Sequence, residues 1–126
     1  MERTSHNIGQ HAEDACCKYL QTQGLKLLGR NYRGRSGEID IIMQDKDGLV
    51  FIEVRFRKNN HYGGALESIT PQKQKRILAT AEQYLQRETK IKNGRIDVVA
   101  MSKKPQNTPS THPDKDYDFE WIKNAF

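Results

Sequence analysis

The sequence predicts an α/β domain in which a mixed β-sheet is flanked by helices. Residues 39–43 and 49–57 are rich in β-branched and aromatic side chains, and the polar residues 44–48 between them are typical of a hairpin turn. One segment with helical spacing of apolar residues precedes this hairpin, and another follows it. A strand-like run after the second helix completes the order α-β-β-β-α-β. At 126 residues, the chain is long enough for one domain with one core, so residues 1–126 are expected to form a single domain.

The first predicted helix covers residues 9–23 and follows a segment, residues 1–8, that is expected to be frayed. Gly24 ends this helix, and residues 25–32 form the first strand. Apolar side chains recur along the helix at the spacing of one face: Ala12, Ala15, Cys16, Tyr19 and Leu20. Cys16 and the adjacent Cys17 point in different directions on a helix, so no disulfide is expected between them.

The second predicted helix begins at Thr70, where a hydroxyl cap is followed by a proline at the first helical position. It runs to about Gln86, and its expected core residues are Ile77, Leu78, Ala81, Tyr84 and Leu85. Residues 95–101 form the last predicted strand. Residues 102–116 are expected to form a mobile loop, after which an apolar C-terminal segment packs back onto the core.

The net charge of +5 is unevenly distributed. Residues 54–104 contain twelve Lys or Arg side chains and four acidic ones, so the basic half of the chain begins directly after the hairpin. Such a patch suits a polyanion, although a basic surface that serves only solubility is equally common. No apolar run approaches the roughly 20 residues of a membrane span, and no signal peptide is evident. We therefore expect a cytoplasmic protein without a membrane partner.

Acidic residues on the apolar hairpin strands need a physical reason, and the register of the hairpin decides between two. If the turn is centred between Lys46 and Asp47, Asp40 faces Glu53, and two carboxylates this close favour a divalent cation between them. If Asp47-Gly48 forms a tight two-residue turn, Asp40 faces Arg55 instead, and the acids only form cross-strand ion pairs. The residue pattern leaves both registers open.

These residues carry a resemblance to known proteins. Asp40 followed by Glu53-Val54-Arg55 is similar to the PD-(D/E)xK signature of nucleases, which places an acid and a Glu-x-Lys on adjacent strands. The stretch from Gly37 to Leu85, the run 95–100 and the ending 120–126 together resemble the YraN family of bacterial proteins, over most of the chain. The resemblance implies a restriction-endonuclease-like core, a mixed sheet with nuclease-like chemistry.

The resemblance implies that Asp40 and Glu53 bind Mg²⁺ or Mn²⁺, and that Glu13 of the first helix can approach the same metal. Glu38 would orient groups or bind a second ion. Arg55 stands where the signature has lysine. Because arginine does not give up its proton, Arg55 suits charge stabilisation and not general-base catalysis. By the same resemblance, Lys73 and Gln74 match a lysine-bearing motif that would reach the metal or a phosphate.

Several cationic and aromatic residues are candidates for binding nucleic acid, each with a plain surface role as its alternative. Three arginines crowd the loop before Gly37, and two lysines flank the start of the second helix, where an anion would offset the helix dipole. Tyr62 could stack on a base. The candidates are Arg30, Arg33, Arg35, Arg57, Lys58, Tyr62, Gln74 and Lys75.

The function expected from these observations is that of a metal-dependent endonuclease, or a junction- or structure-specific nuclease, hydrolysing phosphodiester bonds in DNA. A branch-specific enzyme would act as a symmetric homodimer. Two alternatives remain open at this point. One is a nucleic-acid-binding module of the same fold that does not cut, and the other is a protein-interaction factor whose charged hairpin only pairs ions.

Overall fold

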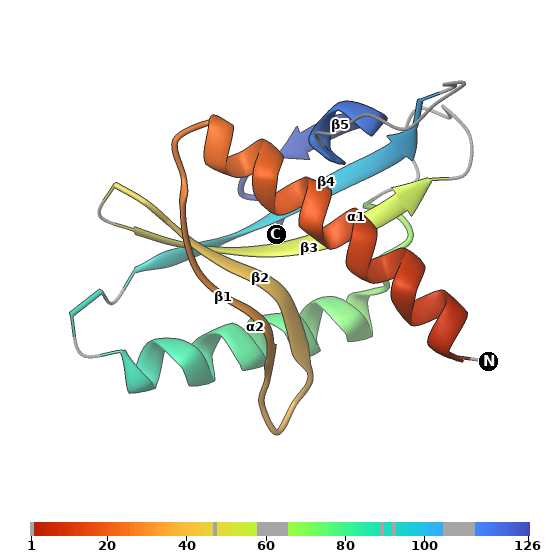
Figure 1. The fold of residues 1–126 in the computed structure, drawn as a ribbon. Coiled ribbons are helices and arrows are strands. Elements are labelled where there is room, and N and C mark those ends of the chain that lie inside the picture. The colour runs from red at the N-terminus through yellow and green to blue at the C-terminus, as the bar shows by residue number, and fades with distance from the viewer. Residues whose placement is uncertain (1, 47, 58–65, 89, 92, 105–112) are drawn as a thin grey trace.

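The computed structural model describes residues 2–46, 48–57, 66–88, 90–91, 93–104 and 113–126, with residues 2–8 and 113 described by their backbone alone. The helices and strands follow one another along the chain in an order close to the expected one (Figure 1). The elements are α1 (Glu2–Thr22), β1 (Lys26–Arg33), β2 (Glu38–Asp45), β3 (Gly48–Arg57), α2 (Pro71–Arg87), β4 (Gly94–Lys103), the 3-10 helix η1 (Pro113–Asp116) and β5 (Tyr117–Ile122).

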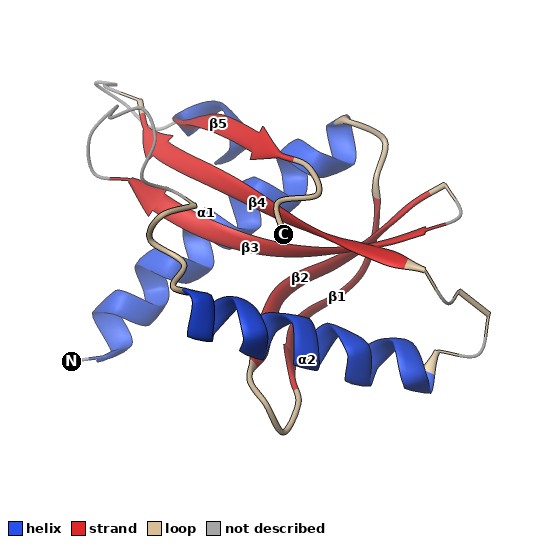
Figure 2. Cartoon of the chain, turned by 180° about the vertical axis from the view of Figure 1, so that it is seen from behind, coloured by secondary structure: helices blue, strands red, loops and turns tan. Residues whose placement is uncertain are grey.

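The five strands form one mixed sheet in the spatial order β1-β2-β3-β4-β5. Strands β3 and β4 pair in parallel, and the other neighbours are antiparallel. A parallel pair requires a crossover connection, and α2 lies in that connection. The helices α1 and α2 cover opposite faces of the sheet (Figures 1 and 2). The prediction of a mixed sheet flanked by helices is therefore confirmed.

Each face of the sheet carries its own apolar core. On the α1 face, Cys16 and Leu20 of the helix pack against Ile52 and Val99 of the central strands. On the α2 face, Ile77 and Ala81 pack against strand residues that include Phe51. Because β3 and β4 are covered on both faces, both read as nearly continuous apolar runs in the sequence.

The two helix-capping positions that the sequence predicted, Gly24 and Thr70, are confirmed. Gly24 has φ 99°, its N–H donates to the carbonyl of Gln21, and Leu25 N–H donates to the carbonyl of Leu20, which is the Schellman pattern. At the start of α2, the side chain of Thr70 accepts a hydrogen bond of 3.2 Å from the backbone N–H of Lys73. No helix among the described residues is long and apolar enough to cross a membrane.

Two element boundaries, the number of strands and one core residue differ most clearly from expectation. Helix α1 begins at Glu2 and not at Gly9, and β4 runs to Lys103, so residues 102 and 103 lie in a strand and not in the expected loop. The C-terminal segment includes a fifth strand, β5, whose alternating sequence pairs with β4. Leu78 is 45% exposed and does not belong to the core. Thr80, two positions further along α2, is buried, and its hydroxyl donates a hydrogen bond to the carbonyl of Arg76.

Candidate metal and phosphate site

The hairpin of β2 and β3 adopts the register that brings the two carboxylates together. Ile41 pairs with Ile52, and Asp45 pairs with Gly48, so the turn is centred after Lys46. The same register, continued by one residue, sets Asp40 opposite Glu53. The alternative tight turn at Asp47-Gly48, which would have paired Asp40 with Arg55, is wrong.

Strand β2 leaves β3 at Asp40. Ile41 packs into the core on the α1 face, whereas Ile39 packs into the core on the α2 face. Strict alternation along a strand would put both side chains on one face of the sheet. The alternation is therefore interrupted at Asp40. Beyond this point β2 pairs with β1 alone, and the two strands diverge from β3 toward their turn (Figure 1). The divergence opens the sheet next to the two acids.

The carboxylate of Asp40 holds this opening in place. Its Oδ2 accepts a hydrogen bond of 2.9 Å from the backbone N–H of Val54, a residue of β3. A backbone donor left without a partner at the end of the paired region would be costly when partly buried. Asp40 therefore has a structural contact as well as an acidic oxygen near Glu53.

Glu53 is a buried carboxyl group in an unfavourable setting for its charge. Glu53 is 6% exposed, and its side-chain Oε1 has no hydrogen-bond partner among the described residues. Burial raises the pKa of Glu53 to about 9, the negative charge of Asp40 adds to the increase, and Arg55 opposes it. At neutral pH Glu53 therefore carries a proton, unless a cation takes the place of that proton.

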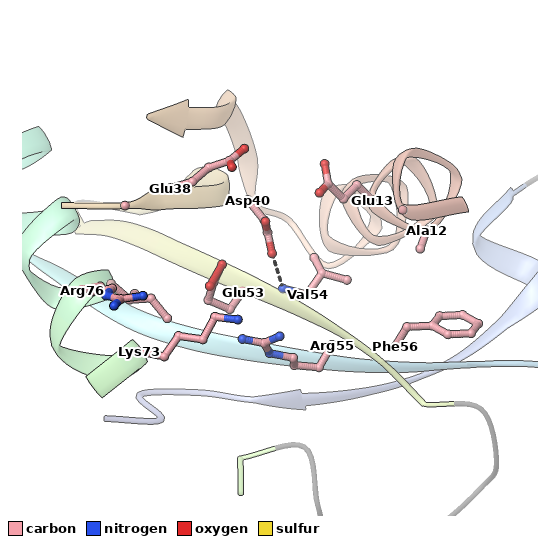
Figure 3. Close-up of a pocket in the computed structure, with 13 residues that line it drawn as sticks. Ala12, Glu13, Glu38, Asp40, Glu53, Val54, Arg55, Phe56, Lys73 and Arg76 are labelled. Carbon is pink, nitrogen blue, oxygen red and sulfur yellow. Dashed lines mark hydrogen bonds between the residues drawn. The ribbon is translucent and has the colours of Figure 1, made fainter. Parts of the chain in front are cut away.

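A cavity of about 400 Å³ surrounds the two carboxylates and extends between α1 and α2. Three cationic side chains line it together with the acids: Arg55 from β3, and Lys73 and Arg76 from the first turns of α2. Figure 3 shows Lys73 and Arg55 directed toward the space beside Glu53. The N-terminal end of a helix favours anions, so α2 adds to the positive character of this side. We call this space the carboxylate cavity.

The structure places the other predicted acids at the edge of the carboxylate cavity, in ion pairs. Glu13 of α1 lies 3.3 Å from Arg30, and Glu38 of β2 lies 3.6 Å from Arg33. Burial and the charge of Asp40 raise the pKa of Glu13, while Arg30 lowers it. Among the described residues, no three His, Cys, Asp or Glu side chains are grouped so that they could hold a metal ion. Glu13 is therefore placed beside the two main acids without joining them in such a group.

The predicted nucleic-acid-binding residues fall into separate groups. Arg30 is engaged with Glu13 and Asp14, and Arg57 pairs with Glu120 at 3.2 Å. The amide of Gln74 donates to the carbonyl of Ile69, and Lys75 is exposed outside the carboxylate cavity. Lys58 and Tyr62 lie outside the described residues. Arg33 and Arg35 line a second cleft, considered below.

The lining residues that the sequence analysis did not name as site residues include Gly37, Phe56 and Arg76. Arg76 follows Lys73 by three positions, so the two share one face of the helix, and this spacing could have revealed it. Phe56 is 44% exposed at the cavity, an uncommon position for a phenyl ring in a strand. Gly37 packs close to α2, where an added Cβ would lie 3.3 Å from the hydroxyl of Thr80.

Comparison with known proteins gives a consistent result. The model of the uncharacterised protein family UPF0102 matches residues 12–101. A UPF0102 protein of Nitrosococcus oceani is 50% identical over 101 residues, covering 79% of this chain and 82% of its own length. A UPF0102 protein of Herminiimonas arsenicoxydans is 44% identical, covering 98% of this chain and 90% of its own, and one of Psychromonas ingrahamii is also 44% identical, covering 98% and 93%.

The matched region contains Asp40, Glu53, Arg55 and both cationic residues of α2 that line the carboxylate cavity. The resemblance to the YraN family, which rested on the hairpin, the helix after it and the C-terminal motif, is confirmed. The chain belongs to the uncharacterised bacterial family UPF0102, the YraN-type family.

Proposed function

We propose that this protein is a nuclease that depends on Mg²⁺ or Mn²⁺ and hydrolyses phosphodiester bonds in DNA at the carboxylate cavity. The observation that carries the proposal is the meeting of two acids with three cations in one space: Asp40 and Glu53 beside Arg55, Lys73 and Arg76. Acids suit a divalent cation, cations suit a phosphate, and a nuclease must hold both at once.

The residues present fit a divalent metal ion. Glu53 has a buried carboxyl oxygen to which no described residue forms a hydrogen bond, and burial and Asp40 both disfavour its ionised form, so a cation would relieve both costs. Asp40, Glu53 and the backbone carbonyl of Val54 would hold it. Oxygen ligands of this kind are those that Mg²⁺ prefers, with water completing its shell. A bound divalent ion supplies a water of lowered pKa as the nucleophile and draws charge away from the phosphate.

The cationic residues would act on the phosphate. Arg55 always carries its charge, so it would stabilise the negative charge that develops on the phosphate oxygens. Lys73 enters from α2 beside Arg55 and would fill the role of the signature lysine, because it brings an ammonium group to the same cavity. Arg76 would orient the phosphate from the edge of the cavity.

The restriction-endonuclease-like core is part of this proposal. The mixed sheet with helices on both faces, and an acid at the point where one strand of a hairpin leaves the other, support it. So does the Glu-x-Arg on the neighbouring strand, with Lys73 placed beside it.

A nucleic-acid-binding module that does not cut is a second candidate, and two observations favour it. The described residues contain no group of three acids suited to a metal, and arginine replaces the signature lysine at position 55. This candidate predicts salt-sensitive DNA binding that does not respond to a divalent metal.

The test is Mg²⁺- or Mn²⁺-dependent cleavage of DNA by wild type, Asp40→Asn and Glu53→Gln, with calorimetric titration of the same ions. Glu82→Gln is the matched control, because Glu82 is an exposed acid of α2 outside the cavity. We expect cleavage and metal binding in wild type and in the control, and neither in the two cavity variants. Equal cleavage by Asp40→Asn would overturn the assignment of the site, and DNA binding without cleavage at any metal concentration would support the second candidate.

A further inference from the structure

A second cleft, of about 340 Å³, lies between the β1–β2 turn and the C-terminal half of α2. Three arginines line it: Arg33 from the end of β1, Arg35 from the turn, and Arg87 from the last turn of the helix. The other described residues that line it are Tyr32, Gly34, Gln83 and Gln86, so none of the described lining residues carries a carboxylate. We call it the arginine cleft. Side chains that donate hydrogen bonds and carry positive charge define the chemistry of an anion site.

The turn that follows Arg33 and carries Arg35 is held in place on α2. Gly34 N–H donates to the carbonyl of Gly37 at 2.8 Å and closes the turn. The amide oxygen of Gln83 accepts from the backbone N–H of Arg35 at 3.1 Å, and its nitrogen lies 3.4 Å from the hydroxyl of Ser36. A Cβ on Gly34 would collide with the end of the Gln83 side chain, so the Gln83 amide would have to shift to admit one. The arginine cleft is a built feature of the fold.

The positive charges of the arginine cleft are poorly compensated by the protein. Within the described parts of the chain, neither Arg35 nor Arg87 forms an ion pair. Arg33 pairs with Glu38 at 3.6 Å, but its side chain is 80% exposed, so the pair is weak. The C-terminal end of a helix disfavours anions, and an anion held here would therefore depend on the guanidinium groups themselves.

The arginine cleft is connected to the carboxylate cavity. Arg33 also lines a third cavity, of about 590 Å³, together with Glu13, Glu38 and Asp40, which belong to the carboxylate cavity as well. Along α2, one face carries polar side chains from one site to the other: Lys73, Arg76, Thr80, Gln83 and Arg87. Arg76 and Gln83 are seven residues apart, about 10 Å along a helix, which exceeds the rise of about 3.4 Å per nucleotide along a stacked strand, so the two sites would take different phosphates.

We propose that the arginine cleft binds a backbone phosphate of the substrate, further along the strand than the phosphate in the carboxylate cavity. This inference rests on the proposed function, and it narrows the substrate to a polynucleotide that extends past the cleavage point on the side of the β1–β2 turn. A mononucleotide or dinucleotide would reach only one of the two sites. Arg33, Arg35 and Arg87 would hold the distant phosphate, and the acids would act on the near one.

The test measures binding of fluorescently labelled single-stranded DNA by anisotropy, without metal, over a range of salt concentrations. Strands of about 2 and about 16 nucleotides are compared, because only the longer one spans both sites at about 3.4 Å for each step. The variant is Arg35→Gln with Arg87→Gln, two exposed side chains whose loss should spare the fold. Lys18→Gln is the matched control: Lys18 is exposed on α1 and lines neither site.

We expect the double variant to bind the long strand about tenfold more weakly, with the slope of log K against log salt reduced by about 0.7, the value for one lost phosphate contact on a single strand. Its binding of the short strand and the behaviour of the control should match wild type. A double variant that keeps the wild-type slope would overturn the inference. Metal-dependent cleavage, measured separately, decides the proposed function. Cleavage with an unchanged slope would overturn only the phosphate-binding role of the arginine cleft. The expected slope change without cleavage would overturn only the catalytic proposal.

Discussion

The side chain of Asp40 accepts a hydrogen bond from the backbone N–H of Val54, across the point where β2 leaves β3. The residue proposed to bind a metal therefore also satisfies a strand donor that has lost its neighbour. These two roles respond differently to substitution, and this difference separates a damaged fold from a damaged site.

Asp40→Asn should keep the fold and lose the metal. An amide oxygen can still accept from Val54, so the free energy of unfolding should stay close to that of wild type. Asp40→Ala leaves the Val54 donor unpaired and should lower it by about 1–3 kcal/mol. Urea unfolding of the two variants measures the difference. Equal destabilisation by both substitutions would mean that the hydrogen bond from Val54 to residue 40 does not contribute to stability.

The pKa of Glu53 makes stability depend on pH. Its pKa is about 9 in the folded protein, against an ordinary value of 4.5. Between these values the folded chain holds a proton that the unfolded chain has released, so stability falls as pH rises, by up to about 1.4 kcal/mol for each pH unit. Glu53→Gln should remove this part of the slope, as measured by unfolding at several pH values between about 5 and 9. A variant with the wild-type slope would contradict the raised pKa.

Binding of Mg²⁺ or Mn²⁺ should release a proton at neutral pH. Glu53 carries that proton without metal, and a metal ligand must be deprotonated. Calorimetry in two buffers of different ionisation enthalpy counts the protons, and we expect about one for each ion bound. Glu53→Gln should bind the ion weakly or not at all. Metal binding to wild type without proton release would place the ion away from Glu53.

Lys73 should matter for cleavage more than for stability. Lys73→Met removes a charge that opposes the dipole at the start of α2, so stability should rise by a few tenths of a kcal/mol or stay the same. Cleavage should fall about 100-fold, which is the lower range for loss of a proton-transfer group. Lys18→Met on α1 is the control for a lost surface charge. Undiminished cleavage by Lys73→Met would mean that a residue other than Lys73 takes the role of the signature lysine.

Gly94 at the start of β4 should not tolerate a larger side chain. A Cβ there would lie 2.8 Å from the ring of Phe51 and 3.3 Å from the carbonyl of Leu49. We expect Gly94→Ala to lower the free energy of unfolding by about 1–3 kcal/mol because of overpacking. At Gly29 nothing lies within 4 Å of an added Cβ, so Gly29→Ala should change stability little. Thermal unfolding of the two variants compares them directly, and equal effects would contradict the tight contact.

The sequence predicted the elements well where local rules decide them. The Thr70 cap and the Gly24 end of α1 follow from short-range backbone chemistry, and both are confirmed. The hairpin register was different. The two candidate registers differ by a shift of two residues, which leaves every side chain on its original face, so the apolar pattern fits both. The choice depended on the turn that joins Asp45 to Gly48.

The parts of the site that the sequence did not predict depend on distant contacts. Arg76 enters the carboxylate cavity only because α2 crosses the end of the β2–β3 hairpin. Asp97 lies within the predicted strand 95–101 and is fully buried, and it accepts hydrogen bonds from Arg95, Trp121 and the backbone of Asn124. These contacts attach the C-terminal segment to β4, and no periodicity in the sequence reveals such a partner.

The two kinds of residue in the carboxylate cavity come from parts of the chain that assemble at different stages. Asp40 and Glu53 are thirteen positions apart in one hairpin, so they meet as soon as neighbouring strands pair. The α2 cations reach them only when the crossover docks β4 beside β3, which joins residues 45 positions apart, as in Leu49 and Gly94. Non-local pairing of this kind is slow to form. A chain still leaving the ribosome would thus hold its acids together before the α2 cations join them, which would tie the proposed cleavage to completion of folding.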